Sequence, residues 1–592
     1  MTSGNDAPLP SAPAHGGDQI GLALAREGVR FLYTLCGGHI APILTGAKRA
    51  GIRVIDVRDE ASAVFAADAT ARLTGIPGVA AVTAGPGVTN AITALKNAQL
   101  AEVPLLLIGG ATGTLLRGRG ALQDIDQLTL LETAVKWLGS CEKVREMVPA
   151  VHQAFTIARA GVPGPVFLET PVDLLYGEDL VRDWYLAAAG KGKDFRSRLL
   201  GGYLRRHANN LFRGAHAEPG SAGEPRRPPI PAPSRSRLGQ ASALISRASR
   251  PVLVVGSQAV ASVAHVPQIA AAIEALGIPV YLAGGARGVL GARHPLQLRH
   301  KRKEALREAD LVLLAGQPID FRLDYGRHIG RGAQLIALAR STEGYAKNRR
   351  PSLSIEADAG LSLIALAQVV SGDLARWGGW LAGLRARDDE RERQIDEGAA
   401  ESLPDGVNPL RLCREIDKIL PDNSVLIADG GDFVATAAYS IAPRKPLSWL
   451  DPGVFGTLGV GGGFALAAGL CRPESEVWLL WGDGSCGFSL AEFDTMARHG
   501  APVLAIVGND ASWSQIAREQ VEILGDDVST VLARTDYHKV AEGYGGVGFV
   551  LERDEDVAGV LADARAALKE GKPVLVNAHL GRSEFRKGSI SM

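Results

Sequence analysis

Short apolar runs alternate with amphipathic segments along most of this chain, and each run ends at a small or polar turn. In the first part, "VRFLYTLC" ends in "GGHIAPIL", "IRVIDVR" leads into "DEASAVFAADATARLTG", and "GVAAVTA" ends in "GPGVTNAITALKNA". This alternation is typical of βαβ units, in which helices cover both faces of a parallel sheet. It returns twice further along the chain. The sequence therefore predicts an α/β protein with three doubly wound parallel-sheet domains.

Breaks in the alternation give the expected domain boundaries. The stretch "AEPGSAGEPRRPPIPAPSRSR" contains six prolines, which favours an extended linker. The charged segment "ARDDERERQIDEGAAESL" has the composition of a solvated helix between two domains. We expect a flexible tail at 1–17, a first domain at 18–178, a basic amphipathic helix and proline-rich linker at 179–237, a middle domain at 238–372, a linker helix at 373–404 and a third domain at 405–592.

Composition excludes several classes of protein. Lys plus Arg equals Asp plus Glu, at 64 each, whereas nucleic-acid binders usually carry a basic excess. The five cysteines have no CxxC spacing, so we expect neither a zinc site nor a disulfide framework, and a reducing cytoplasm suits them. The first residues lack the basic and apolar regions of a signal peptide, and no apolar run approaches the roughly 20 residues of a membrane span.

Two oxygen-bearing turns follow neighbouring apolar runs in the last third of the chain. "EVWLLW" ends at Gly482-Asp483-Gly484, and "APVLAIVG" ends at Asn509-Asp510. Ligands of open α/β sheets bind at the carboxyl edge, where both turns are expected to lie. Such oxygens suit Mg²⁺, which retains open positions for phosphate and water. A Gly-Asp-Gly tripeptide is common, so taken alone it is equally explained by an ordinary capped turn.

The spacing and flanks of these turns resemble the thiamine-diphosphate signature. "DVRDEASAVFAADATARLTG" is similar to the segment of the acetolactate synthase superfamily whose glutamate activates thiamine. "TAGPGVTNAITALKNA" is similar to its glycine turn, and "LDPGVFGTLGVGGGFALAAGL" to the segment beneath the thiazolium ring. The resemblance covers residues 18–590. It implies that the three domains are pyrimidine-binding, middle and diphosphate-binding.

Further segments narrow the resemblance to the acetolactate synthase-like and 2-hydroxyacyl-CoA lyase group. They are "GRGALQDIDQ", "DGGDFVATAA", "VGNDASWSQIAREQ" and "TDYHK". The group implies a lyase, dependent on thiamine diphosphate and Mg²⁺, that cleaves 2-hydroxyacyl-CoA to formyl-CoA and an aldehyde, or joins them in reverse. The alternatives are an acetolactate synthase acting on pyruvate and a non-catalytic thiamine-binding paralogue. A Rossmann dehydrogenase is disfavoured because no GxGxxG opens a helix after the first strand.

The resemblance also assigns roles to individual residues. Glu60 is implied to bond the pyrimidine ring, although Asp59 stands where the family usually has His. Asp483, Asn509, Asp510 and the Ser512 carbonyl are implied metal ligands. Asp510 replaces the usual Asn, so either Asn509 or Asp510 is the side chain that reaches the metal. The implied cofactor contacts are Glu60, Gly85, Pro86, Asn90, Gly431, Asp432, Gly456, Leu458, Gly482, Asp483, Gly484, Ser485, Asn509 and Ser512.

Two more positions bear on the substrate and its chemistry. Gln123 falls where the family places an active-site glutamine, and the resemblance makes it a catalytic candidate. His39 follows a predicted strand, where a proton-transfer role competes with that of a satisfied loop histidine.

The middle domain resembles oxalyl-CoA decarboxylases and 2-hydroxyacyl-CoA lyases and lacks the flavin contacts of acetolactate synthases, so FAD is not expected. Arg287, Arg293 and Arg302 are candidates to meet the phosphates of CoA or of a bound ADP. The competing interpretation is a solvated basic face.

The last feature is a basic segment at 190–215. Phe195, Leu199 and Tyr203 recur every four residues with arginines between them, which predicts an amphipathic helix. We favour packing of this helix on its own protein over contact with a membrane surface. By resemblance, the chain forms a homodimer or homotetramer with its active sites at the subunit interface.

Overall fold

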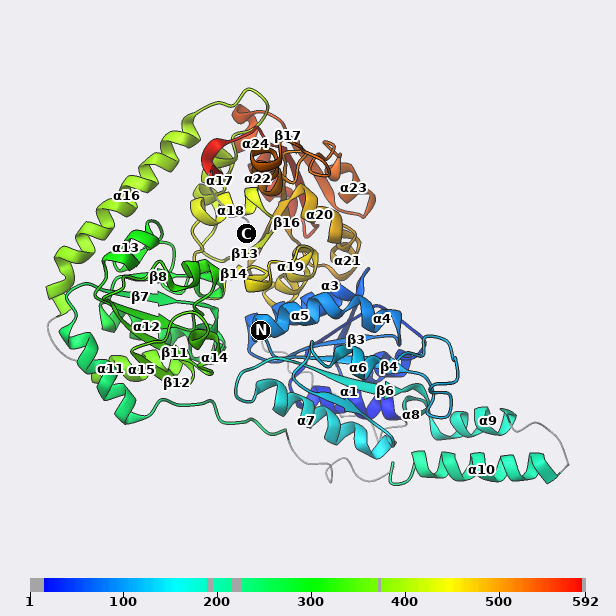
Figure 1. Ribbon diagram of the computed structural model, residues 1–592. Helices are drawn as coiled ribbons and strands as arrows, with labels where there is room; N and C mark the ends of the chain where they lie inside the picture. The colour runs from blue at the N-terminus through cyan, green and yellow to red at the C-terminus, as the bar shows by residue number, and fades with distance from the viewer. Residues whose placement is uncertain (1–14, 189–194, 216–224, 371–373, 588–592) are drawn as a thin grey trace. The chain divides into compact units, whose positions relative to one another are not determined.

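The computed structural model describes residues 15–188, 195–215, 225–370 and 374–587 (Figure 1). The chain divides into two compact units: residues 1–71 with 76–229, and residues 72–75 with 230–592. Unit 1 contains one six-stranded sheet, and unit 2 contains two. All strand pairs within the three sheets are parallel, which confirms the predicted fold class.

The sheet of unit 1 has the strand order β2-β1-β3-β4-β6-β5. Its strands are β1 Phe31–Thr34, β2 Arg53–Asp56, β3 Gly78–Val82, β4 Leu105–Ala111, β5 Leu138–Ser140 and β6 Pro165–Pro171. Its helices are α1 Gly16–Arg26, α2 Ala41–Arg49, α3 Glu60–Thr74, α4 Pro86–Asn90, α5 Ile92–Leu100, α6 Gln127–Leu131, α7 Met147–Arg159, α8 Val172–Leu175, α9 Glu178–Ala188 and α10 Phe195–Leu211. Every residue of β3, β4 and β6 is buried, as expected when helices cover both faces of a parallel sheet.

The first sheet of unit 2 belongs to the middle domain and has the order β12-β11-β10-β7-β8-β9. Its strands are β7 Pro251–Val255, β8 Val280–Leu282, β9 Gln297–Leu298, β10 Leu311–Ala315, β11 Gln334–Ala339 and β12 Leu353–Glu356. Its helices are α11 Arg235–Arg247, α12 Val266–Leu276, α13 Arg302–Glu308, α14 Glu343–Ala346 and α15 Ala359–Val369, and the long helix α16 Gly378–Ala400 follows them.

The second sheet of unit 2 has the order β14-β13-β15-β16-β18-β17. Its strands are β13 Ser424–Asp429, β14 Trp449–Leu450, β15 Glu476–Gly482, β16 Leu504–Asn509, β17 Val547–Leu551 and β18 Val574–His579. Its helices are α17 Pro409–Ile419, α18 Asp432–Ser440, α19 Val460–Cys471, α20 Asp483–Ser489, α21 Glu492–His499, α22 Ser514–Leu524, α23 Tyr537–Gly543 and α24 Val557–Leu568. The large buried side chains Trp478 and Trp481 lie on its central strand β15.

Several element boundaries differ from those expected. Helix α1 begins at Gly16, inside the segment expected to be a tail, while residues 1–14 lie outside the described residues. The region after 178 holds two helices, α9 and α10, rather than one. The expected Gly-Asp-Gly turn is already helical at Asp483, and a break after Ser489 separates α20 from α21.

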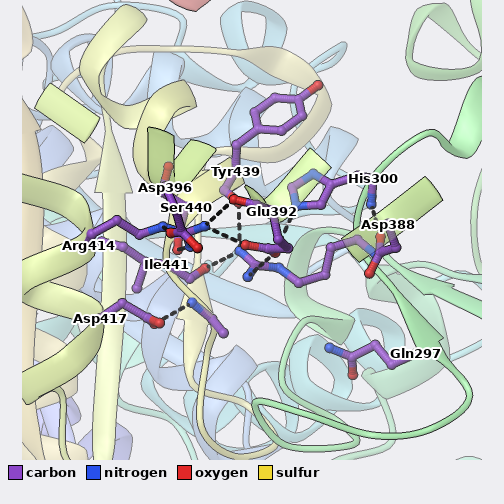
Figure 2. A network of polar contacts seen from close by, with 12 residues as sticks. Gln297, His300, Asp388, Glu392, Asp396, Arg414, Asp417, Tyr439, Ser440 and Ile441 are labelled. Carbon is purple, nitrogen blue, oxygen red and sulfur yellow. Dashed lines mark hydrogen bonds and ion pairs between the residues drawn. The ribbon is translucent and has the colours of Figure 1, made fainter. Parts of the chain in front are cut away.

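Helix α16 links the two sheets of unit 2 through the carboxylate of Glu392 (Figure 2). On the middle-domain side, Oε1 accepts hydrogen bonds from Arg299 (3.2 Å) and His300 (2.8 Å). On the other side, Oε2 accepts one from Arg414 of α17 at 2.5 Å. Burial alone would raise the pKa of Glu392, but these donors hold it at about 2. The carboxylate is therefore ionised and joins both parts of unit 2.

Among the described residues, no helix combines the length and the apolar character needed to cross a membrane. All five cysteines are free thiols, and only Cys36 is exposed.

Candidate cofactor site

Glu60 is the first residue of α3, at the carboxyl edge of the sheet in unit 1. Its side chain is buried, with 6% of its surface exposed. The Asn90 amide donates a 3.0 Å hydrogen bond to Oε2, and a helix N-terminus favours a negative charge at this position. Asp59, just before it, accepts a bond from the Ala61 amide at 2.7 Å and so caps the helix. The structure thus brings the predicted Glu60 and Asn90 together and fixes one oxygen of the carboxylate.

The glycine turn after β3 lies beside Glu60. Gly85 has φ +62°, and a Cβ there would lie 2.7 Å from the Gln123 carbonyl oxygen, so only glycine fits this position without strain. Its amide donates to Oε1 of Gln127 at 3.1 Å. The next glycine, Gly87, has an ideal Cβ position only 3.4 Å from Oε1 of Glu60. The backbone of this turn therefore approaches the buried carboxylate closely.

Gln123 and His39 are joined through Thr83. The Thr83 hydroxyl donates to Oε1 of Gln123 at 3.3 Å, and Nδ1 of His39 lies 3.3 Å from the same hydroxyl. Burial lowers the pKa of His39, and the hydrogen bond with Gln123 opposes this effect. His39 thus has partners within unit 1, as a satisfied loop histidine would.

A cavity of about 310 Å³ lies next to Gln123, and sequence reasoning missed the polar residues behind it. Glu169 on β6 is buried and accepts hydrogen bonds from Arg117 at 2.5 Å, from Ser140 at 2.9 Å and from Gln127 at 3.0 Å. The only available signal was the single acid in the apolar run "GPVFLETP", because a charge inside a buried parallel strand requires partners. These residues give the cavity wall a fixed polar lining.

In unit 2, Asp483 follows β15 and Asn509 is the last residue of the neighbouring strand β16, and the register of the two strands pairs Gly482 with Gly508. Both side chains are buried, with 4% and 0% of their surface exposed. Oδ2 of Asp483 and Oδ1 of Asn509 accept no hydrogen bond from the described residues. Buried oxygens without partners are costly, and they are the ligands that Mg²⁺ prefers. The donor set present therefore fits a divalent cation.

Asp510 lies close enough to affect Asp483 electrostatically. Burial and the charge of Asp510 raise the pKa of Asp483 to about 7, and burial raises the pKa of Asp510 as well. Two neighbouring carboxyl groups that resist ionisation gain most from a bound cation. Asn509, in contrast, directs its amide nitrogen to Thr535 and to Asn577 of β18. The Ser512 amide donates to Asp510 at 3.2 Å, next to Ala511 at φ +56°.

Asp429, at the end of β13, is a site-supporting residue that sequence reasoning missed. Its fully buried carboxylate accepts hydrogen bonds from Gly461 at 2.8 Å, Trp481 at 3.1 Å and Gly459 at 3.2 Å. Gly459 has φ +91°. Leu458, the residue expected beneath the cofactor, immediately precedes this turn, so Asp429 fixes the backbone that presents it. "SVLIAD" contained the signal, an acid at the last residue of a buried strand.

The remaining predicted contacts surround these turns. Gly431 caps α18, where Asp432 forms an ion pair with Arg518. Ser485 donates to the backbone carbonyls of Asp429 and Gly482. A Cβ on Gly484 would lie 2.3 Å from the Trp513 ring, so this position also requires glycine.

Two of the three candidate arginines of the middle domain are engaged within unit 2. Arg287 donates to the Ala438 carbonyl and stacks on Trp449, and Arg302 donates to the Arg322 carbonyl. Burial lowers the pKa of Arg287 to about 10. Arg293 is exposed and has no polar partner among the described residues. Of the three, it is therefore the one whose guanidinium has all its donors available.

Asp429 gives unit 2 a specific pH dependence. Burial raises its pKa to about 7, although its three donors oppose this effect. The folded apoprotein therefore holds a proton that the unfolded chain releases above about pH 4, and its stability falls as pH rises from about 4 to about 7, by up to roughly 4 kcal/mol. In Asp429→Asn the fall should be smaller by this amount, and the part that Asp483 contributes should remain. Calorimetry of both proteins across that range measures it, with the exposed Asp422→Asn as control. Parallel curves for wild type and Asp429→Asn would contradict the assignment.

The geometry of both units agrees with the comparisons to known proteins. Three models of thiamine pyrophosphate enzymes match: the N-terminal TPP-binding domain at residues 14–130, the central domain at 238–366 and the C-terminal TPP-binding domain at 429–578. The chain is 48% identical over 587 residues to 2-hydroxyacyl-CoA lyase 2 of Danio rerio, covering 98% of this chain and 94% of that protein. It is 47% identical to the human protein of the same name over 585 residues, covering 98% and 92%. A probable acetolactate synthase of Mycobacterium bovis is 33% identical over 575 residues, covering 96% of each chain. These matches confirm the resemblance seen in the sequence: the chain belongs to the thiamine pyrophosphate enzymes, in the group that includes 2-hydroxyacyl-CoA lyase 2.

Proposed function

We propose that this protein is a carbon–carbon lyase, dependent on thiamine diphosphate and Mg²⁺, that acts on 2-hydroxyacyl-CoA. The observation that carries the proposal is the near-full-length identity with proteins named 2-hydroxyacyl-CoA lyase 2. In the reaction the bond between C1 and C2 breaks, the 2-hydroxyl carbon leaves as an aldehyde, and C1 gains a proton and leaves as formyl-CoA. The reverse reaction joins the same two products.

Bound thiamine diphosphate supplies the carbon nucleophile and the electron sink for this cleavage. The residues of the chain position and protect that chemistry. Glu60 holds a proton at the pyrimidine ring, and Asn90 keeps its carboxylate in one orientation. Gln123 and the polar residues around Glu169 line a cavity in unit 1. There the 2-hydroxyl and thioester oxygens of a substrate find hydrogen-bond partners. Leu458, on the turn held by Asp429, would support the bound cofactor.

Mg²⁺ would be held by Asp483 and Asp510, with the Ser512 carbonyl as a further ligand. Asp510 is favoured over Asn509 because the amide of Asn509 is already bonded on the side of β18, while the charge of Asp510 acts directly on Asp483. Because Oδ1 of Asn509 accepts no hydrogen bond from the described residues, Asn509 is the alternative metal ligand to test.

Glu60 belongs to unit 1 and Asp483 to unit 2. We propose that the two half-sites meet between two chains, so that a homodimer is the smallest active assembly, and that the protein acts in the cytoplasm. The free thiols suit such a compartment.

Product analysis tests the proposed reaction. Purified protein with thiamine diphosphate and Mg²⁺ is given a panel of 2-hydroxyacyl-CoA thioesters of increasing chain length and, separately, pyruvate. Mass spectrometry should detect formyl-CoA and the matching aldehyde in equal amounts. The relative from Mycobacterium bovis makes acetolactate synthase the rival function. Acetolactate from pyruvate, without formyl-CoA from any thioester, would replace the proposal with that function.

Glu60→Gln should leave the fold and cofactor binding largely intact and slow the reaction by orders of magnitude, because an amide cannot exchange a proton with the ring. Hydrogen–deuterium exchange at C2 of the bound cofactor measures the step directly. Mixing Glu60→Gln chains with Asp483→Ala chains should restore part of the activity, since one site of each mixed dimer carries neither change. Normal exchange in Glu60→Gln would remove this residue from the role. Full activity in a monomer would refute the shared site.

Asp510→Ala should weaken Mg²⁺ binding strongly, while Asp510→Asn keeps a coordinating oxygen and should lose affinity only modestly. Titrating Mg²⁺ against activity at saturating thiamine diphosphate gives the apparent affinity, and excess Mg²⁺ should partly rescue Asp510→Ala. Asn509→Ala is the matched comparison at the adjacent position. If it loses the metal while Asp510→Ala behaves like wild type, Asn509 is the ligand.

A further inference from the structure

Helices α9 and α10 form a hairpin that extends from the sheet of unit 1 (Figure 1). The end of the hairpin nearest the sheet packs against unit 1. Leu204, Ala208 and Leu211 on the inner face of α10 are buried, and Leu211 joins the hydrophobic core of unit 1. His207 lies 2.8 Å from the Thr114 hydroxyl and packs edge-on against Tyr185 of α9. The second half of α10 is therefore part of the fold, and its orientation on unit 1 is fixed.

The opposite face of α10 is apolar and open to solvent. Phe195, Leu199 and Tyr203 recur every four residues and so lie along one stripe of the helix. Their exposed fractions are 78%, 66% and 57%. The helix runs without a break through Gly201 and Gly202, so the stripe is continuous. The inner face of α10 packs against the core of unit 1, whereas the outer face has no partner among the described residues.

Arginines border the stripe, and α10 itself carries no acidic residue. The sequence of α10, "FRSRLLGGYLRRHANNL", contains four arginines and no Asp or Glu. At about 100° per residue, Arg206 falls within the stripe, Arg196 beside it, and Arg198 and Arg205 on its flank. None of the four has an ion pair or side-chain hydrogen bond among the described residues. The chain as a whole is neutral, so this basic surface is a local concentration of charge.

We propose that the outer face of α10 is a docking surface for a membrane with anionic lipids. An exposed apolar stripe with arginines on either side is the pattern of a helix that lies in the plane of a bilayer interface. Aromatic side chains are suited to the depth of the headgroups, and guanidinium groups pair with lipid phosphates in bidentate geometry. A second copy of the chain fits less well, because two such faces would bring arginines together without carboxylates on either α10.

Vesicle flotation of the full-length chain tests this proposal. Phosphatidylcholine vesicles are compared with vesicles that also contain phosphatidylserine, at low and high salt. The protein should float with the anionic vesicles, and salt should weaken the binding because it screens charges at the surface. Phe195→Ser/Leu199→Ser/Tyr203→Ser removes the stripe, and Arg196→Glu/Arg206→Glu reverses two charges. Each variant should bind on the order of tenfold more weakly or worse.

Matched controls lie on α11 and α15 of unit 2. Arg235→Glu/Arg247→Glu reverses two exposed charges there, and Val369→Ser removes an exposed apolar side chain. Both should float like the wild type, and all variants should keep the wild-type unfolding midpoint. Failure of the wild type to float with anionic vesicles, or unchanged flotation of both α10 variants, would overturn the proposal. A smaller assembly in the stripe variant, measured by light scattering, would instead assign this face to a second copy.

Discussion

Parallel strands must be covered on both faces and must all end at the same edge, and this constraint organises each sheet of the protein. Because β3, β4 and β6 are wholly buried, polar side chains are tolerated mainly where strands give way to turns. The same rule places Asp429, Asp483 and Asn509 at the ends of three neighbouring strands of the third sheet. The candidate cofactor residues are therefore gathered at two sheet edges, one in each unit.

The predictions made from the sequence succeeded where a local pattern carries the information. The parallel sheets follow from apolar periodicity, and the family follows from several separate motifs. The charged linker segment forms the helix α16, and Asn509 ends a strand as expected, whereas Asp483 already belongs to α20. The pattern failed where the partner is distant in the chain. The role of Glu169 depends on hydrogen bonds from Arg117, 52 positions away in the sequence, and from Ser140, 29 positions away. Asp429 likewise depends on Gly461, 32 positions further on. Helix boundaries also shifted, since α20 already begins at Asp483 and α10 continues through two glycines.

The carboxyl edge of the third sheet contains groups that lower the stability of the folded protein. Two carboxyl groups are held in a buried environment that disfavours their charged form, and two buried oxygens lack hydrogen bonds among the described residues. Each of these features costs free energy in the protein alone, and a cation bound by Asp483 and Asp510 would relieve both carboxyl groups together. The edge is thus preorganised for a ligand rather than optimised for the empty fold, as expected of a functional site.

The Glu392 junction has a consequence for how unit 2 comes apart. One ionised, partly exposed carboxylate on α16 accepts hydrogen bonds from the middle domain and from α17, so detaching either neighbour removes donors from this charge. This contact favours the loss of structure in both sheets of unit 2 together, because a fluctuation that opens only one of them loses charge-assisted hydrogen bonds. Through the hydrogen bonds of Glu392, a structural change in the middle domain also affects α17 and the third sheet, to which α17 belongs.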